Sequence, residues 1–179
     1  MFSTLVESIF AFVKEEYGFK AKILEHNRVQ YERDDTFIRL THTGLDEVSL
    51  RVGTLSRGLD KSFSAGVLVA LRDSNRGFSL RDRIASKPNQ IEEALIEQAQ
   101  ILRTHGKRVL KNDLTVFDEM ENVVESYWSA RNDAQIRQRA EAAFTAKSFE
   151  QALKQYRLLG NRRSLLDTKR MEICERALR

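Results

Sequence analysis

The spacing of apolar residues changes twice along this chain, from helical to strand-like and back to helical. Between residues 29 and 52, apolar side chains alternate with polar ones, as in strands with one buried face. Before this segment and after Pro88, the only proline, apolar residues recur every three or four positions, as in amphipathic helices. These changes predict an α+β fold: an N-terminal helix on an antiparallel meander sheet, followed by a helical C-terminal half.

The first segment carries one apolar stripe at helical spacing. Thr4 and Glu7 have the spacing of a capping box at its start. Gly18 is a natural stop, because glycine adopts the left-handed backbone conformation without steric cost. We expect this helix to pack on the sheet through its stripe, which consists of Phe2, Leu5, Val6, Ile9, Phe10 and Val13.

Runs of alternating residues predict four or five short strands joined by turns, one of them at Thr43-Gly44. One face of the sheet is expected to lie under the N-terminal helix. The other face carries Arg39 and Arg51 and is expected to face solvent or a partner. The apolar members of the runs are Val29, Tyr31, Ile38, Leu40, Val48, Leu50, Val52, Phe63, Val67, Val69 and Leu71.

The boundary between the sheet and the helical half is predicted near Pro88. Ser79 and Asp82 have capping-box spacing and predict a short helix through Ile84. Proline then disfavours helix in the residue before it. We therefore expect a helix-plus-sheet region over residues 1–86 and a helical region over 87–179. The helical region either folds back to form one continuous domain with the first or forms a small subdomain of its own. The helices expected in the second region span about 90–105, 113–128, 133–146 and 148–159, with a last one after Ser164.

The net charge of +4 is unevenly distributed. Residues 131–179 contain 12 Lys and Arg against 6 Asp and Glu, whereas the rest of the chain is slightly acidic. A basic helical face is typical of a solvated surface, of a surface for an acidic protein, or of phosphate binding, which strengthens with the number of cations. The candidate partner-binding residues are Arg39 and Arg51 on the sheet and Lys154, Arg157, Arg162 and Arg163 in the basic segment.

Several function classes find no support in the sequence. A single Cys excludes a disulfide framework, and the three His are too far apart for a metal motif. Phosphate-binding glycine loops and nucleophile motifs are missing, so we expect no enzyme, no catalytic residue, no metal and no cofactor. Apolar runs fall short of the ~20 residues that span a bilayer, and a signal peptide is missing, so we expect a cytoplasmic protein without membrane contact. One enzymatic alternative places carboxylates of Glu92, Glu97, Glu121 and Glu125 in one cleft.

Residues 140–159 read AEAAFTAKSFEQALKQYRLL. Small residues alternate there with aromatic ones, and the segment resembles a single tetratricopeptide-type helical hairpin. In that family small residues let two helices approach closely and aromatic residues fill the space between hairpins. Lys147 stands in the tight turn, where the family usually has glycine. The resemblance implies a packing or protein-binding element.

A second resemblance covers the whole chain. Its elements are EYGF at residues 16–19, the Val29-x-Tyr31 strand, a strand ending in Glu-Val-x-Leu-x-Val-Gly at 47–53, and the lone hairpin. This arrangement is similar to small bacterial cytoplasmic proteins that include immunity proteins of polymorphic or contact-dependent toxins. It implies a non-catalytic protein-binding module that masks a toxin or serves as a complex subunit. The alternative is a nucleic-acid-binding accessory protein that uses the basic C-terminal helices; the oligomeric state stays open.

Overall fold

The computed structural model describes residues 1–43, 46–80 and 82–179. Helices take up 59% of it and strands 18%, which confirms the predicted α+β fold. The chain divides into two compact units, Met1–Val124 and Glu125–Arg179, called here the first and second unit. The division expected at residues 86–87 falls inside the first unit, because the helix that begins at Pro88 packs on the sheet.

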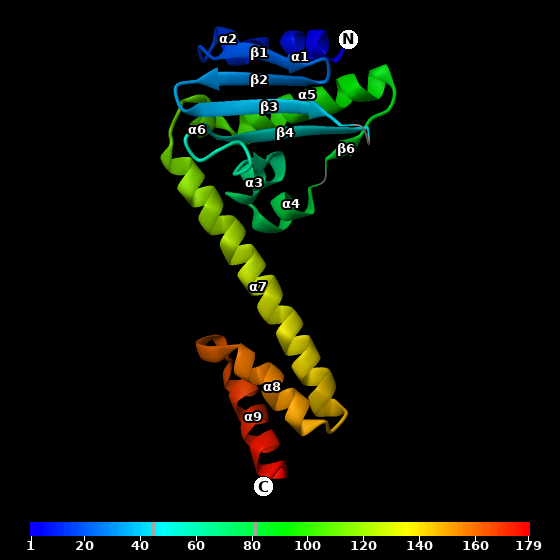
Figure 1. Ribbon diagram of the computed structural model, residues 1–179, viewed down its shortest axis with the longest axis vertical. Coiled ribbons are helices and arrows are strands. Elements are labelled where there is room, and N and C mark those ends of the chain that lie inside the picture. The colour runs from blue at the N-terminus through cyan, green and yellow to red at the C-terminus, as the bar shows by residue number, and fades with distance from the viewer. Residues whose placement is uncertain (44–45, 81) are drawn as a thin grey trace. The chain divides into compact units, whose positions relative to one another are not determined.

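The sheet of the first unit is an antiparallel meander (Figure 1). Its four main strands are β1 (Lys20–Glu25), β2 (Arg28–Arg33), β3 (Thr36–His42) and β4 (Glu47–Thr54). Two short strands complete it: β5 (Phe63–Ser64) pairs with one part of β4 and β6 (Arg83–Ile84) with another. The meander is as predicted; Gly44, in the turn expected between β3 and β4, lies outside the described residues.

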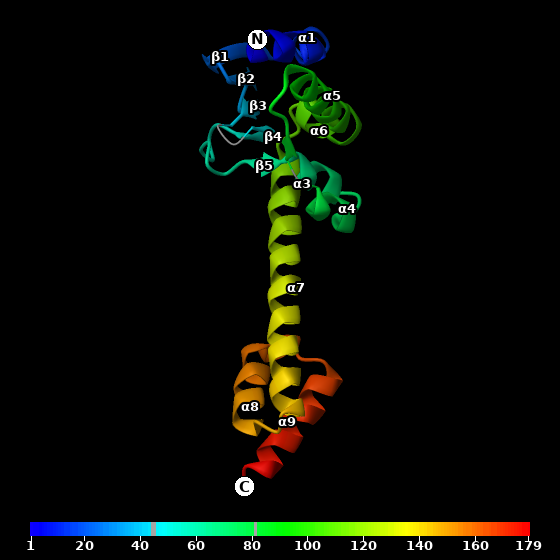
Figure 2. The ribbon, with the colours of Figure 1, turned by 90° about the vertical axis from the view of Figure 1, so that its right-hand side faces the viewer.

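Helices cover one face of this sheet (Figure 2). They include α1 (Phe2–Ile9), α2 (Ala11–Glu15), α3 (Ala65–Ala70), α5 (Pro88–His105) and α6 (Lys107–Leu110). Apolar side chains of α1, α5 and the strands form one continuous core, with Phe10, Tyr31, Leu50, Leu95 and Leu102 fully buried. The N-terminal helix packs on the sheet as expected. Its predicted capping box does not form, because α1 already begins at Phe2, after Met1.

The last predicted strand is instead the helix α3. All six residues of α3 are buried, so the segment has no polar positions whose spacing distinguishes a strand from a helix. The following helix, α4 (Ser74–Ser79), is capped by the Asp73 side chain, which accepts a hydrogen bond from the Arg76 amide at 3.1 Å. The short helix predicted over 79–84 is therefore wrong: a helix ends at Ser79, Arg83 and Ile84 form β6, and Arg81 lies outside the described residues.

A single helix, α7 (Thr115–Thr145), replaces the two that were predicted over 113–128 and 133–146. Asp113 caps its start as expected, with Oδ1 accepting a hydrogen bond from the Thr115 amide at 3.1 Å. The segment between the two predicted helices contains neither glycine nor proline, so nothing in it stops a helix. The boundary between the two units falls within α7, after Val124.

The second unit consists of the C-terminal part of α7, α8 (Phe149–Leu158), the 3-10 helix η1 (Gly160–Arg162) and α9 (Leu165–Ala177). Figures 1 and 2 show α8 and α9 beside the end of α7. The predicted stop at Gly160 and the predicted Ser164–Asp167 capping box are both confirmed. The core of the unit consists of Ile136, Ala140, Ala152, Leu153, Tyr156, Leu159 and Cys174.

The turn between α7 and α8 has left-handed backbone at Lys147, with φ of 57°. The Ser148 amide donates to the Ala143 carbonyl at 2.9 Å and the Lys147 amide to the Phe144 carbonyl at 3.0 Å. These two bonds define a Schellman motif, in which the residue at the position of Lys147 is usually glycine. Lysine therefore carries the strain of this conformation.

We expect Lys147→Gly to stabilise the second unit by about 0.5–1 kcal/mol. The left-handed conformation costs an L-residue roughly 1–2 kcal/mol, and glycine gives back about 0.5–1 kcal/mol through its larger chain entropy. Urea unfolding of the full chain measures the change. Gly160→Ala is the matched control: at φ of 52°, with no atom within 4 Å of the added Cβ, it should lose about 1 kcal/mol. A loss of stability in Lys147→Gly would contradict the argument.

Candidate partner-binding surfaces

The two candidate arginines of the sheet are direct cross-strand neighbours, Arg39 on β3 and Arg51 on β4. Their neighbours along each strand belong to the core, so both side chains lie on the face opposite the helices. Like charges directly opposite each other destabilise a sheet. The structure avoids this repulsion because the two side chains have different partners. Arg39 Nε donates to Gln30 Oε1 at 2.8 Å. Arg51 lies near Asp82, and it partly offsets the burial that raises the pKa of the Asp82 carboxyl.

This face of the sheet is partly covered around Arg39. The guanidinium lies 5.1 Å from the centre of the buried Phe37 ring, and that ring packs on Gly53 of β4. Burial lowers the pKa of Arg39, as does nearby Arg28, and Asp60 only partly offsets both. Arg39 Nη2 is buried without a hydrogen-bond partner in the part of the chain that the structure describes. Arg39 is thus held within the first unit and is less open than the alternation predicted.

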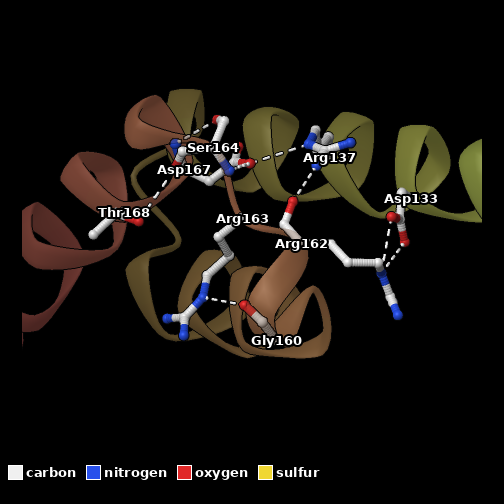
Figure 3. A network of polar contacts seen from close by, with 8 residues as sticks. All are labelled: Asp133, Arg137, Gly160, Arg162, Arg163, Ser164, Asp167 and Thr168. Carbon is white, nitrogen blue, oxygen red and sulfur yellow. Dashed lines mark hydrogen bonds and ion pairs between the residues drawn. The ribbon is translucent and has the colours of Figure 1, made fainter.

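Three of the four basic candidates in the second unit have partners within that unit, and two of these three, Arg162 and Arg163, are drawn in Figure 3. Arg162 Nε donates to both carboxylate oxygens of Asp133, at 2.9 and 3.1 Å. Arg163 Nε donates to the Gly160 carbonyl at 2.7 Å, and its Nη1 lies 3.2 Å from Met171 Sδ. These arginines hold η1 in place, so replacing them tests folding rather than binding.

A second arginine–aspartate pair runs beside the first. Arg137 Nε donates to Asp167 Oδ2 at 3.0 Å, and Arg137 Nη2 donates to the Arg162 carbonyl at 2.6 Å. Both aspartates are buried, at 7% exposure for Asp133 and 4% for Asp167. The sequence did not reveal these two pairs, since their partners lie about 30 residues apart. The one local signal is that Asp133 and Arg137 are one helical turn apart on α7.

The other two basic candidates, Lys154 and Arg157, lie together on the exposed side of α8. Two shallow cavities, of about 580 and 310 Å³, lie along this side and share Gln151 and Lys154. Leu158, 57% exposed, lines the first, and Arg139 of α7 lines the second. We call Arg139, Gln151, Lys154, Arg157 and Leu158 the α8 surface.

The cations of the α8 surface outnumber the carboxylates beside them: Glu150 lines the first cavity, together with Lys154 and Arg157, and Arg139 lines the second. Arg157 lies 3.6 Å from Glu175, a distance that gives a weak ion pair at an exposed site. The side chains of Arg139 and Lys154 make no ion pair or hydrogen bond within the described ranges 1–43, 46–80 and 82–179. An apolar residue in a concave surface beside free cations can bind a partner that offers both apolar and acidic groups.

Two carboxylates of the enzymatic alternative have different partners within the first unit. Glu97 lies 3.6 Å from Arg83, and Glu121 lies 3.3 Å from Arg57. Cys174 is buried, as the sequence predicted, and burial raises the pKa of its thiol, which disfavours the reactive thiolate. Within the described residues, no three or more His, Cys, Asp or Glu are grouped so as to hold a metal ion.

Comparisons with protein-family models, with curated proteins and with solved structures found no match for this chain. Among the helices of the described ranges, none combines the length and the apolar character needed to cross a bilayer. The predicted resemblances to tetratricopeptide hairpins and to immunity proteins stay predictions.

Proposed function

We propose that this protein is a non-catalytic protein-binding module that binds an acidic partner protein through its α8 surface. The observation that carries the proposal is the exposed Leu158 beside the unpaired cation Lys154 in a concave surface. Burial of the leucine gives affinity of about 25 cal/mol per Å² of apolar area removed from water. The cations speed the encounter with an acidic partner and orient it.

Exposed apolar side chains elsewhere in the second unit support the proposal. Trp128 is 58% exposed, stands edge-on to Tyr127 and has the Arg131 guanidinium 5.8 Å from its ring centre. Trp, Tyr and Arg are the residues that most often dominate the energy of protein interfaces. Further exposed apolar residues of this unit are Leu165, Leu166, Ile173 and Leu178.

The biological role we propose is that of a bacterial immunity protein that masks a toxin, or of a subunit of a defence complex. It is supported by the resemblance of the EYGF and Glu47–Gly53 segments and of the hairpin. A toxin gene next to the gene for this protein provides the test. Co-expression should restore growth to cells that produce that toxin, and continued growth arrest would contradict the role.

Charge reversal on α8 tests the binding proposal. We expect Lys154→Glu combined with Arg157→Glu to reduce partner binding at least tenfold, about 1.4 kcal/mol, because attraction to acidic groups becomes repulsion. A photo-crosslinking residue at position 158 reports on binding in native lysate, and mass spectrometry identifies the adduct. Lys169→Glu with Arg176→Glu, on exposed positions of α9, makes the same charge change away from this surface.

The adduct distinguishes the proposal from its alternative. A protein adduct that forms with the wild type and the α9 variant but not with the α8 variant supports the proposal. Equal adducts in all three proteins contradict it. A nuclease-sensitive adduct, with retention on duplex DNA that falls steeply as salt rises, indicates the alternative function of a nucleic-acid-binding accessory protein.

A further inference from the structure

The two cavities of the α8 surface adjoin each other and form one groove along α8. Both are lined by Gln151 and Lys154. The part of α8 that lines them spans residues 150–158, a length of about 12 Å at the usual helical rise. Arg139 and Ala143 of α7 also line the second cavity. The groove is therefore long enough to hold about two turns of a partner helix.

The groove presents a side chain once per helical turn. Its lining includes Glu150, Lys154 and Arg157, which follow one another at steps of four and three residues. Residues at such steps lie on one face of a helix, about 5.4 Å apart along its axis. A partner helix presents the side chains of one face at the same interval, whereas a strand presents them about every 6.6 Å. A helix therefore stays in step with the groove.

The second unit offers no backbone hydrogen bonds to an extended partner. Its elements are helices, and no strand occurs within residues 125–179, all of which the structure describes. An extended segment gains affinity by adding a strand to a free sheet edge, where its main-chain N–H and C=O groups find partners. A helix satisfies its own main-chain groups and needs only side-chain contacts. The surroundings of the groove therefore favour a helical partner segment.

The lining of the groove determines which side chains this partner helix should carry. The apolar lining residues are Ala143, Leu153 and Leu158, and of these Leu158 is the most exposed, at 57%. The three cations of the α8 surface outnumber the carboxylates of Glu150 and Glu175 beside them. An apolar stripe on the partner helix covers the leucine, and acidic residues beside that stripe meet the cations.

We infer that the partner segment bound by the α8 surface is an amphipathic α-helix whose apolar stripe is flanked by acidic residues. The inference rests on the proposed function, because it specifies which kind of segment of the acidic partner contacts this surface. The stripe consists of apolar residues at i, i+3 or i+4, and i+7, as in other helices that bind in grooves. One apolar residue per turn is enough to follow a groove of about 12 Å.

Photo-crosslinking from two positions of the groove tests the conformation of the partner segment. Gln151 and Leu158 are two helical turns apart, about 10 Å along α8. A crosslinking residue at position 151 or 158 of the full chain captures the partner in native lysate, and mass spectrometry maps the partner residue in each adduct. We expect the two adducts to lie about seven residues apart in one partner segment. An extended segment covers the same length in about three residues.

The control for the crosslinks is position 169, on an exposed part of α9, which should not capture this segment. A synthetic peptide of the captured segment gives a second measurement, by fluorescence anisotropy with the full chain. Proline in the middle of the peptide, on the side away from the adducts, should weaken binding at least tenfold, because proline breaks a helix. Alanine at the same position should leave binding unchanged.

The outcomes separate this inference from the proposed function. Adducts about three residues apart, adducts in separate segments of the partner, or a proline peptide that binds as tightly as the alanine peptide would overturn the inference. The proposed function would still stand in these cases, provided that the charge reversal on α8 abolishes the adducts. If no protein adduct forms at position 151 or 158, the proposed function itself fails, and the inference fails with it.

Discussion

Gly77→Ala should destabilise the first unit by about 3 kcal/mol, although alanine is the better helix former. A Cβ on Gly77 would lie 2.3 Å from the Ala70 amide nitrogen and 2.5 Å from the Ala70 Cα. These are backbone atoms, so no side-chain rotation relieves the clash and α4 must move away from α3. Overpacking of this kind costs about 1–3 kcal/mol or more. That exceeds the gain of about 1 kcal/mol in helix propensity.

Hydrogen exchange of peptides from residues 65–80, with urea unfolding of the full chain, measures this loss where it arises. Asn75→Ala is the control, because Asn75 is an exposed residue of the same helix. Its effect should stay within about 0.5 kcal/mol, as for most surface substitutions. If Gly77→Ala is as stable as the wild type, the close approach of the two helices is not a feature of the folded protein.

The sequence predicts those elements whose apolar spacing has a period. The stripe of α1 and the alternation in β2, β3 and β4 are visible because each element has one buried and one polar face. In α3 every residue is buried, so its sequence has no period that distinguishes a helix from a strand. In α7 the helix start expected near Asp133 does not occur. Asp133 lies inside the helix, where its carboxylate accepts a hydrogen bond from Arg162 of η1 and does not cap a helix.

For the candidate surfaces, the sequence predicts only the face of a strand or helix on which a residue lies. Alternation places Arg39 and Arg51 on one face, and helical spacing places Lys154 and Arg157 on another. Spacing does not tell which cations remain free, because that depends on partners distant in sequence, such as Asp133 for Arg162.

Asp167→Ala should destabilise the second unit by about 3 kcal/mol. The Asp167 carboxylate accepts the Ser164 amide at 2.8 Å, and loss of such a cap costs about 1 kcal/mol. The substitution also leaves the Arg137 guanidinium without its carboxylate partner. Breaking a fully buried ion pair in this way costs about 3–5 kcal/mol. The Arg137 side chain is 38% exposed, so water replaces part of that interaction and the sum stays near 3 kcal/mol. Hydrogen exchange of residues 125–179 measures the loss.

The difference in stability between the wild type and Asp167 variants should depend on pH, and this dependence separates the contribution of the Asp167 charge from that of its side-chain shape. Burial alone would raise the pKa of the Asp167 carboxyl, but hydrogen bonds from Ser164 and Arg137 outweigh it and lower the pKa. The unfolded carboxyl titrates near pKa ~3.9, so the full contribution is present above that pH and is lost as pH falls through the lower folded value. The gap between wild type and Asp167→Asn should therefore narrow below about pH 4. Glu172→Gln is the control, because Glu172 is an exposed carboxylate of α9, and its stability should differ little from that of the wild type. If the difference between wild type and Asp167→Asn stays constant with pH, Asp167 stabilises the protein through its shape alone.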